Sequence, residues 1–531
     1  MNGDERKEDG SNDESEQQLE VLMCGYFPGV TAQRSPLNSP ASVRFPEAEA
    51  PGDSWKDICA GGCGFGMAIS GSKLKCDSRV TNVRLRKDEM ITIEAADIQD
   101  FRLFEVEIIN ASGKLVTWGS SDDQGQSYFA SGKHGETPEV YPLPSPNPIM
   151  EAAASWAHCV SVTDKGEVYT WGWKECVPSV KITCTWNTLK TSDDQTGERQ
   201  SSTITDQGIP QSHSLNSTTG SVLGSNDKLS GDEMLKRRKV VPQQDSEALT
   251  PADETLSMPP CPVSLDPGVR ITSVAAGGRH TLALSDVGQV WGWGYGGEGQ
   301  LGLGSRIKMV ASPHLIPCID PSLNGGGSSG VNNQNSVDSA AEPKKSIGNY
   351  VKGIACGGRH SAVITDTGVL LAFGWGLYGQ CGQGNTEDIL RPTFVPFLRD
   401  SQIKAVAAGL WHTICISSDG RVYVFGGNQF GQLGLGTHQD QCEVVPRLLD
   451  ASVLESKKAK IASSGARHNA ILTEDGKLFC WGWNKYGQLG LGDAVDRNIP
   501  EEVTLKEDHK MKNVACGWWH TLLLCETTRT N

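Results

Sequence analysis

The sequence lacks the long apolar runs that membrane-spanning helices require. None of its hydrophobic stretches approaches the ~20 residues that a helix needs to cross a bilayer. The first residues, MNGDERKEDGSNDESEQQ, are acidic and polar and have no apolar stretch of the kind found in a secretory signal. We therefore expect no membrane partner.

The chain also lacks an excess of basic residues. It has 48 Lys and Arg against 63 Asp and Glu, which gives a formal net charge of −15. Binding to a phosphate backbone needs clustered positive charge, so we expect no direct sequence-specific binding to nucleic acid. An acidic surface would instead attract basic protein partners such as histones.

The 16 cysteines include no C-x-x-C pair, which argues against a zinc site. Five of them lie within strand-like runs: Cys159, Cys356, Cys415, Cys480 and Cys516. We interpret them as small buried thiols of a reducing compartment, with a disulfide framework as the alternative.

What the sequence does contain is glycine, with 61 residues, and a repeated phrase. A short apolar strand, a glycine turn, a histidine and a second apolar strand recur, as in VAAGGRHTLAL. The last four turn histidines are 52, 56 and 52 residues apart. All six are His158, His280, His360, His412, His468 and His520.

Each of these histidines except the last is followed, thirteen residues later, by an aromatic residue and a glycine. Between them lies a hairpin signal such as SSDGRVY, in which Asp-Gly separates two alternating strands. Four copies continue into a glycine-rich turn such as FGQLGLG. Each unit therefore has room for four short strands, which make one blade of a β-propeller.

The ends of the chain complete the count. The first copy, ICAGGCGFGMAIS, has Gly64 in the place of the histidine. There are then seven turn-plus-strand elements but only six aromatic-glycine strands after them, and EVLMCGYFPG (20–29) supplies the seventh. We predict an all-β fold, a seven-bladed propeller over 19–531, closed by N-terminal strands that pair with the C-terminal blade and so cover its open edge.

Several stretches interrupt the repeat. We interpret 75–110, which separates two strands joined elsewhere by a tight turn, as an insertion that arose from an error in the gene model; a functional loop is the alternative. The polar stretch 176–258 is expected to be a disordered loop, 321–347 a flexible loop and 1–18 a disordered acidic tail.

A basic cluster stands in the second of these stretches. Lys236, Arg237, Arg238 and Lys239 follow one another in an otherwise polar, acidic segment. Such a cluster in an exposed loop is typical of a nuclear import signal, although an ordinary solvated charge run would look the same. We predict that the protein is nuclear, with the cytoplasm as a second compartment.

The phrases VAAGGRHTLAL, DGRVYVFGGNQFGQLGLG and DGKLFCWGWNKYGQLGLG resemble the regulator-of-chromosome-condensation repeat. The resemblance runs from about residue 20 to residue 525, apart from the interruptions. The combination of seven such repeats with the basic cluster resembles a plant nuclear member of that family. The resemblance implies the same N-terminal closure that the strand count predicts.

A ring of six histidines could be read as a metal or catalytic site. Equivalent positions in neighbouring blades are on the order of 10 Å apart, whereas zinc ligands lie at ~2 Å, so we predict no metal, cofactor or catalytic residue and no enzyme activity of its own. We expect each histidine to pack at its glycine turn and to donate a ring N–H to a backbone carbonyl.

Three functions remain open. The first, which we favour, is a nuclear scaffold that associates with chromatin or histones and regulates gene expression. The second is a guanine-nucleotide exchange factor for a Ran-like small GTPase, the activity of the family's founding type. Family members dock on nucleosomes partly through basic tails, whereas residues 4–20 here hold eight acidic and two basic residues, which argues against direct DNA contact.

The third function is a UV-B light sensor like the plant photoreceptor of this repeat family. In that protein Trp occupies the position two residues before the turn histidine in successive blades. Here only Trp156 and Trp518 fit, and the blade that carries Gly62 lies between theirs. We therefore expect no tryptophan pair from adjacent blades.

Overall fold

The computed structural model describes residues 17–26, 36–43, 45, 53–61, 66–72, 113–118, 138–178, 257–319, 348–436, 442–506 and 509–528. All of them belong to one compact unit made of residues 1–181 and 255–531. Their strands form seven four-stranded antiparallel sheets, as the sequence predicts. The only helices among the described residues are short 3₁₀ turns, and none of them could cross a membrane.

The sheets are the blades, numbered along the chain, with the strands of each given from the centre of the ring outward. Blade 1 contains β3 (Asp53–Ala60), β4 (Gly66–Ser72), β5 (Leu115–Trp118) and β6 (Glu139–Val140); blade 2 contains β7 (Ile149–Ala154), β8 (His158–Thr163), β9 (Val168–Trp173) and β10 (Ser257–Pro262); blade 3 contains β11 (Ile271–Ala276), β12 (His280–Ser285), β13 (Val290–Gly296) and β14 (Ile307–Ile316); blade 4 contains β15 (Val351–Cys356), β16 (His360–Thr365), β17 (Leu370–Gly374) and β18 (Ile389–Phe394).

The remaining blades follow the same pattern. Blade 5 contains β19 (Ile403–Ala408), β20 (His412–Ser417), β21 (Val422–Gly426) and β22 (Glu443–Leu448); blade 6 contains β23 (Ala459–Ser464), β24 (His468–Thr473), β25 (Leu478–Gly482) and β26 (Arg497–Glu502); blade 7 contains β27 (His509–Cys516), β28 (His520–Thr528), β1 (Gln17–Gly25) and β2 (Leu37–Ser42). The 3₁₀ turns are η2 (Lys174–Cys176), η4 (Pro396–Leu398) and η5 (Ser452–Leu454).

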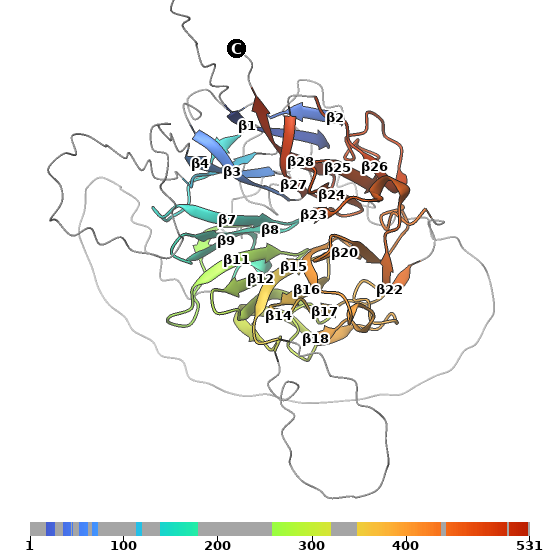
Figure 1. The fold of residues 1–531 in the computed structure, drawn as a ribbon. Helices are drawn as coiled ribbons and strands as arrows, with labels where there is room; N and C mark the ends of the chain where they lie inside the picture. Colours follow the sequence, from blue (N-terminus) through green and yellow to red (C-terminus); the bar gives the residue numbers. More distant parts are fainter. Residues whose placement is uncertain are drawn as a thin grey trace, which may run out of the picture. The chain divides into compact units, whose positions relative to one another are not determined.

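Blade 7 confirms the predicted closure. Strand β1 pairs with β28 over its whole length, from Gln17 opposite Thr528 to Gly25 opposite His520, and β2 pairs with the outer edge of β1. In Figure 1 the blue strand β1 lies beside the red strand β28, although the two are at opposite ends of the sequence. The strand begins at Gln17, so the last two residues of the expected tail are part of it.

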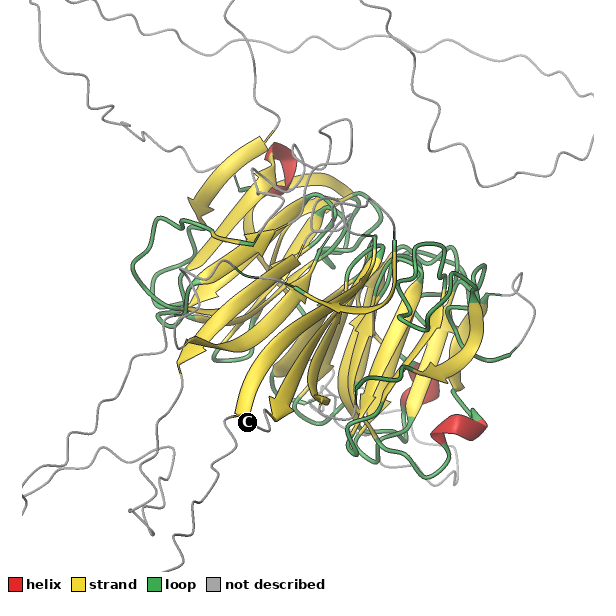
Figure 2. Ribbon diagram, turned by 90° about the horizontal axis from the view of Figure 1, so that it is seen from above, coloured by secondary structure: helices red, strands yellow, loops and turns green. Residues whose placement is uncertain are grey.

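Consecutive blades contact one another around the ring, and β28 of blade 7 contacts β3 of blade 1. Figure 2 shows the sheets standing face to face, with loops at both ends of the strands. The hairpin signals produce the expected turns: in blade 5, Gly420 has a φ of +88° and Ile416 pairs with Val422 across it. Such a φ is accessible to glycine without strain, which explains the Asp-Gly signature.

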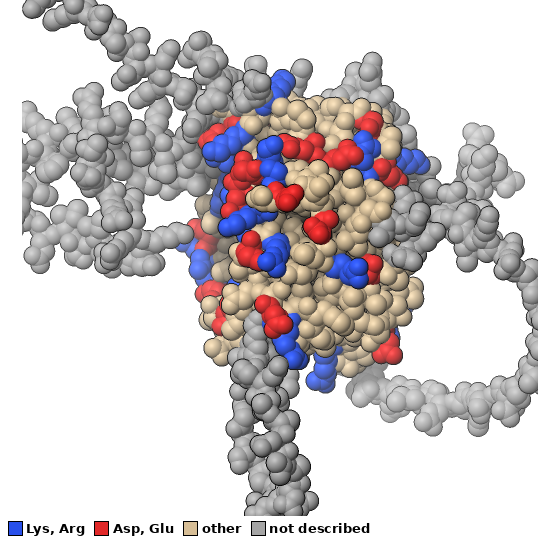
Figure 3. Space-filling view, turned by 45° about the vertical axis from the view of Figure 1, so that its right-hand side comes forward, with Lys and Arg blue, Asp and Glu red and all other residues tan. Residues whose placement is uncertain are grey.

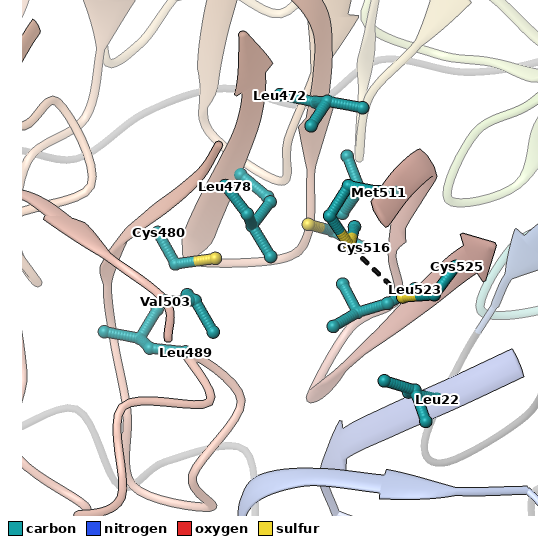
Figure 4. Packing of buried hydrophobic residues seen from close by; sticks show 12 residues of the cluster. Leu22, Leu472, Leu478, Cys480, Leu489, Val503, Met511, Cys516, Leu523 and Cys525 are labelled. Atoms are coloured by element: carbon teal, nitrogen blue, oxygen red, sulfur yellow. Dashed lines mark hydrogen bonds between the residues drawn. The ribbon is translucent and has the colours of Figure 1, made fainter. Parts of the chain in front are cut away.

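The core consists of apolar layers between neighbouring blades. Between blades 6 and 7, Leu478 and Cys480 of β25 pack with Leu523 of β28 and with Leu22 of the N-terminal strand (Figure 4). Leu22 and Leu523 also face each other in the strand pairing. The N-terminal strand therefore closes the hydrogen-bond ladder and fills the core at the same time.

The cysteines are free thiols where the structure describes them. Four of the five predicted buried residues are buried, and Cys356 is half-buried. Burial raises the pKa of Cys516 to about 12 and the pKa of Cys480 well above its usual value, so these thiols stay protonated at neutral pH. The interpretation as packing residues is confirmed for these positions.

One alignment from the sequence is wrong by one residue. In blade 3 the residue after the histidine, Thr281, pairs with Trp293, whereas in blade 1 the residue opposite the aromatic Trp118 is Gly66. The histidine-equivalent position is therefore 65 and not Gly64. The reason is that the turn between the paired residues Ala60 and Gly66 is one residue longer than its counterpart in blade 3.

Most of the predicted interruptions lie outside the described residues. This applies to 75–110, 321–347 and the basic cluster at 236–239. For the loop expected at 176–258, the structure describes both ends: Cys176 closes η2, and Ser257 begins β10, the outer strand of blade 2. The predicted loop therefore overlaps a blade strand at its C-terminal end.

Candidate functional site

One face of the propeller carries all the glycine-histidine turns and the glycine-rich turns, and we call it the turn face. Each blade from 2 to 7 ends there in the same way. The N–H of the residue after the glycine of the aromatic-glycine pair donates to the carbonyl of the residue before the histidine. The six pairs are Trp173 with Ala157, Tyr295 with Arg279, Trp375 with Arg359, Gly427 with Trp411, Trp483 with Arg467 and Tyr26 with Trp519.

The glycine that precedes the donor residue lets the two backbones approach each other closely. Gly294 has a φ of +96°, and a Cβ there would lie 2.6 Å from the carbonyl oxygen of Arg279. Gly426 has a φ of +111°, and its Cβ would lie 2.5 Å from the carbonyl oxygen of Trp411. The aromatic-glycine signature of the sequence therefore marks the point where the backbone bends onto the turn face.

The turn histidines connect neighbouring blades. The Nε2 atoms of His158, His280, His360 and His468 lie 2.6–2.9 Å from a hydroxyl of the next blade, on Thr281, Ser361, Thr413 and Thr521 respectively. The Nε2 atom of His412 lies 2.7 Å from the Oδ1 atom of Asn469. The expectation that the rings donate to backbone carbonyls is therefore wrong at these five positions.

At four seams the contact continues into a backbone carbonyl. Ser361, Thr413 and Thr521 donate their hydroxyl proton to the carbonyls of Gln300, Gln380 and Gln488 at 2.7–2.8 Å, and the Nδ2 atom of Asn469 donates to Gln432. A hydroxyl has a single proton, so it accepts from the histidine. The histidine is therefore the Nε2–H tautomer, and each seam holds a directed relay from ring to side chain to carbonyl.

The seam between blades 7 and 1 differs. The acceptor position after the first-copy turn is Gly66, which has no side chain to receive a hydrogen bond. Across this seam, the Trp518 N–H donates to the Gly61 carbonyl at 2.9 Å, and the Asn513 amide donates to Asp57 at 2.7 Å. Backbone and amide contacts thus cross the seam where the ring closes.

Five of the six histidines are held neutral by burial. All six are fully buried, and burial lowers the pKa of His158 and His412 to about 4 and the pKa of His280, His360 and His468 to about 3. Protonation of His158, His280, His360, His412 or His468 would place a second N–H at Nδ1, which is buried and has no acceptor among the described residues. The side chains cannot reach a substrate, so they act as connectors between blades.

Next to these turns, side chains form a closed series of contacts that we call the aromatic–arginine ring. It contains Trp518, Trp156, Trp173, Arg279, Tyr295, Glu298, Arg359, Trp375, Tyr378, Trp411, Arg467, Phe430, Trp483, Tyr486, Tyr26 and Trp519. Neighbouring aromatic centroids in it lie 5.2–6.0 Å apart. Because Trp518 and Trp519 are adjacent in the chain, the ring of contacts closes on itself.

Trp156 and Trp518 come from blades that are not adjacent, as the sequence predicts, and yet they form a pair. Their rings stack with centroids 5.7 Å apart and an interplanar angle of 24°, and Trp173 contacts Trp156 edge-on at 6.0 Å. Their two blades are not neighbours, since blade 1 lies between them, and the Trp518 N–H donates to the carbonyl of Gly61, which follows β3 of blade 1. Trp156 is exposed and Trp518 half-exposed.

Three arginines stand in the ring, each directly before a turn histidine. Arg279 pairs with Glu175 and lies 4.3 Å from the centroid of Trp173. Arg359 pairs with Glu298 at 3.2 Å and lies over Trp375. Arg467 lies among three aromatic rings and has no acidic partner among the described residues.

At the centre of the turn face is a small cavity of about 60 Å³, lined mainly by alanines, glycines and the ring of Trp518. Sites for small organic ligands usually have ~300–1,000 Å³. The cavity itself is therefore smaller than a typical site for an organic cofactor.

The expected acidic surface is not a property of the propeller blades. Nearly all of the net charge of −15 belongs to residues outside the described ranges, such as the acidic positions among residues 4–16. On the side shown in Figure 3, positive and negative side chains are interspersed and separated by broad uncharged areas. Electrostatic attraction of a basic partner would therefore come from the segments outside the described ranges.

The sequence profile of the RCC1-like domain family matches residues 191–523, more than half of the chain. The ultraviolet-B receptor of Arabidopsis thaliana is 35% identical over 267 residues, which are 50% of this chain and 53% of the receptor. The X-linked retinitis pigmentosa GTPase regulator of Mus musculus is 40% identical over 152 residues, 29% of this chain and 15% of the regulator. The chain spans about half the length, or less, of these curated relatives.

Among solved structures, Prp20p of Saccharomyces cerevisiae superimposes with a TM-score of 0.60 at 17% identity, over 97% of this chain and 93% of Prp20p. Its structure was studied together with its binding to Gsp1p and histones. At this level of identity the similarity shows a shared fold.

We predict that stability depends on pH through the buried histidines. In the unfolded chain they titrate near 6.5, but in the fold only near 3–4, so the unfolded state takes up protons first as the pH falls. The free energy of unfolding should hold steady above pH 6.5 and decrease towards pH 4, by up to ~1.4 kcal/mol per pH unit for each histidine. Denaturant unfolding at pH 8, 6 and 5 measures this.

His412→Gln is the matched control for this prediction. Glutamine can still donate to Asn469 but does not titrate. The free energy of unfolding of the variant should therefore depend less steeply on pH, by the contribution of one histidine. If the free energy of unfolding of the wild-type protein does not change between pH 6.5 and 5, the assignment of neutral histidines is contradicted. The same holds if His412→Gln shows the same pH dependence as the wild-type protein.

Proposed function

The chain belongs to the RCC1-like domain family, and on that basis we propose that it is a nuclear protein-interaction scaffold that associates with chromatin or histones and regulates gene expression. The observation that carries the proposal is the aromatic–arginine ring. It concentrates Trp, Tyr and Arg on one rigid face, and these are the residues that dominate the energetics of protein–protein interfaces.

The rigidity of the face supports this proposal. The ring residues follow directly on the histidine relays and glycine bends, so their backbones are held before any partner arrives. A preorganised face loses little conformational entropy on binding. Histones are proposed as the partner because Prp20p, which has the same fold, was studied for histone binding, and because the acidic segments of this chain would attract a basic protein.

Direct binding to labelled histone octamers, measured by fluorescence anisotropy, tests the proposal. We expect binding that weakens at least tenfold in Trp375→Ala, because this half-buried ring bridges Arg359 and Tyr378 on the turn face. Tyr350→Ala is the control: the side chain is 49% exposed and lies at the opposite end of the blade, so binding should be unchanged.

The same preparation separates the scaffold from the alternative, an exchange factor for a Ran-like GTPase. Gsp1p loaded with labelled GDP is the probe. Strong acceleration of GDP release without histone binding would overturn the scaffold proposal in favour of exchange. Histone binding without acceleration supports it, and equal weakening by both alanine variants would contradict the assignment to the turn face.

We also propose that Lys236, Arg237, Arg238 and Lys239 direct nuclear import. Replacing all four with alanine should shift a fluorescently tagged full chain from the nucleus to the cytoplasm, because the import machinery recognises clustered positive charge. Replacement of Lys308 and Lys510, two lysines outside the cluster, is the control for loss of charge alone. Unchanged nuclear accumulation of the fourfold variant would contradict this proposal.

A second candidate function is the sensing of UV-B light, which the stacked pair Trp156 and Trp518 favours. Arg279 lies over Trp173, so a cation also stands beside the indole cluster. If this function holds, UV-B irradiation of the purified chain should change its circular dichroism and its elution volume, and Trp156→Phe should abolish the change. Trp55→Phe is the control, since Trp55 packs on Phe45 away from the pair. An irradiated wild-type protein that stays unchanged would dispose of this candidate.

A further inference from the structure

Arg467 occupies an aromatic cage at the seam between blades 5 and 6. Its guanidinium carbon lies 4.4 Å from the centroid of Phe430, 5.1 Å from that of Trp411 and 5.3 Å from that of Trp483. Trp411 and Phe430 come from blade 5, and Trp483 comes from the blade of Arg467 itself. Ring faces attract the positive charge and hold the guanidinium in place.

The seam between blades 3 and 4 shows what Arg467 lacks. There the equivalent arginine, Arg359, pairs with Glu298 of the preceding blade at 3.2 Å. Glu298 and Phe430 occupy the same position in their turns, because each N–H donates to the side chain of the glutamine two residues later, Gln300 or Gln432, at 2.8–3.0 Å. The repeat therefore substitutes a phenyl ring for a carboxylate next to Arg467.

This substitution leaves hydrogen-bonding capacity unused. A guanidinium has five N–H donors in its plane, and rings stacked on its faces cannot accept them. Among the described residues Arg467 forms no ion pair and its side chain no hydrogen bond, whereas Arg279 and Arg359 each pair with a glutamate. Burial among the rings lowers the pKa of Arg467, so its charge is partly removed from water and an anion would regain that lost solvation.

We propose that Arg467, with Trp411, Phe430 and Trp483, is a recognition site for an oxyanion carried by a protein partner, either the carboxylate of an acidic side chain or a phosphate. The planar fork of an arginine binds either group through two parallel hydrogen bonds. The proposal rests on the proposed function, in that it names the chemistry of one contact on the turn face. The site is half-exposed and lies at the surface, so a side chain can reach it without a change in the blades.

The test uses the purified full chain and three fluorescein-labelled hexapeptides: hexaglutamate, hexaglutamine, and a glycine-serine hexapeptide with one phosphoserine. We expect hexaglutamate or the phosphopeptide to bind and hexaglutamine not to bind. Binding to hexaglutamate alone identifies carboxylate as the ligand, and binding to the phosphopeptide alone identifies phosphate. If neither binds at millimolar concentration, the proposal is overturned.

Phe430→Glu is the decisive variant because it keeps Arg467. The new carboxylate should pair with Arg467 as Glu298 pairs with Arg359, and so weaken binding of the anionic peptide at least tenfold, to the level of Arg467→Ala. Phe430→Leu removes the ring without adding a charge and should retain most of the binding. Equal affinity in the wild-type chain and Phe430→Glu would overturn the proposal, since binding would then be a general charge effect.

Glu298→Gln is the reciprocal variant. It releases Arg359 from its partner and should add a second site, which raises the stoichiometry of peptide binding from one towards two. A stoichiometry that stays at one would mean that loss of a glutamate alone does not create a site, and would contradict the inference from the repeat. Histone binding retained in Arg467→Ala, with no peptide binding in the wild-type chain, would sink this site and leave the scaffold proposal standing.

Discussion

The structure depends on the joint between one blade and the next. A four-stranded sheet has two apolar faces and cannot be stable alone, so each blade must be held at a fixed distance and rotation from its neighbours. The relay from His360 through Thr413 to the Gln380 carbonyl does this with directional contacts in a dry environment. Apolar packing alone would not define the rotation, since it is not directional.

The candidate interaction face follows from that joint. The residue before each histidine and the residue after each aromatic-glycine pair are hydrogen-bonded to each other, so a relay that fixes His468 also fixes Arg467 and Trp483. Because all the relays stand at one end of the blades, their flanking side chains meet as a ring. The partners proposed here would thus contact positions whose backbone geometry the fold already determines.

The fold could be predicted from the sequence because its signals are local and repeated. Histidine, hairpin turn and aromatic-glycine pair recur at fixed spacing, and the missing strand at Leu22 follows from counting. The site was harder to predict, since its contacts join residues that spacing does not relate. Trp156 and Trp518 come from blades that are not neighbours, and nothing in their spacing along the chain indicates that their rings stack.

The alignment predicted for blade 1 was wrong by one residue for a related reason. A glycine-rich turn can gain one residue without changing its composition, so the sequence ICAGGCGFG does not reveal whether Gly64 or position 65 corresponds to the histidine. The sequence does contain an indication of the proposed anion site, but it emerges only when the glycine-rich turns of different blades are compared. Aligning GGEGQ with NQFGQ places Glu298 against Phe430. Where the repeat has the glutamate, its arginine forms an ion pair within the fold. Where the repeat has the phenylalanine, the arginine keeps its place over the ring and its N–H groups are left for a partner.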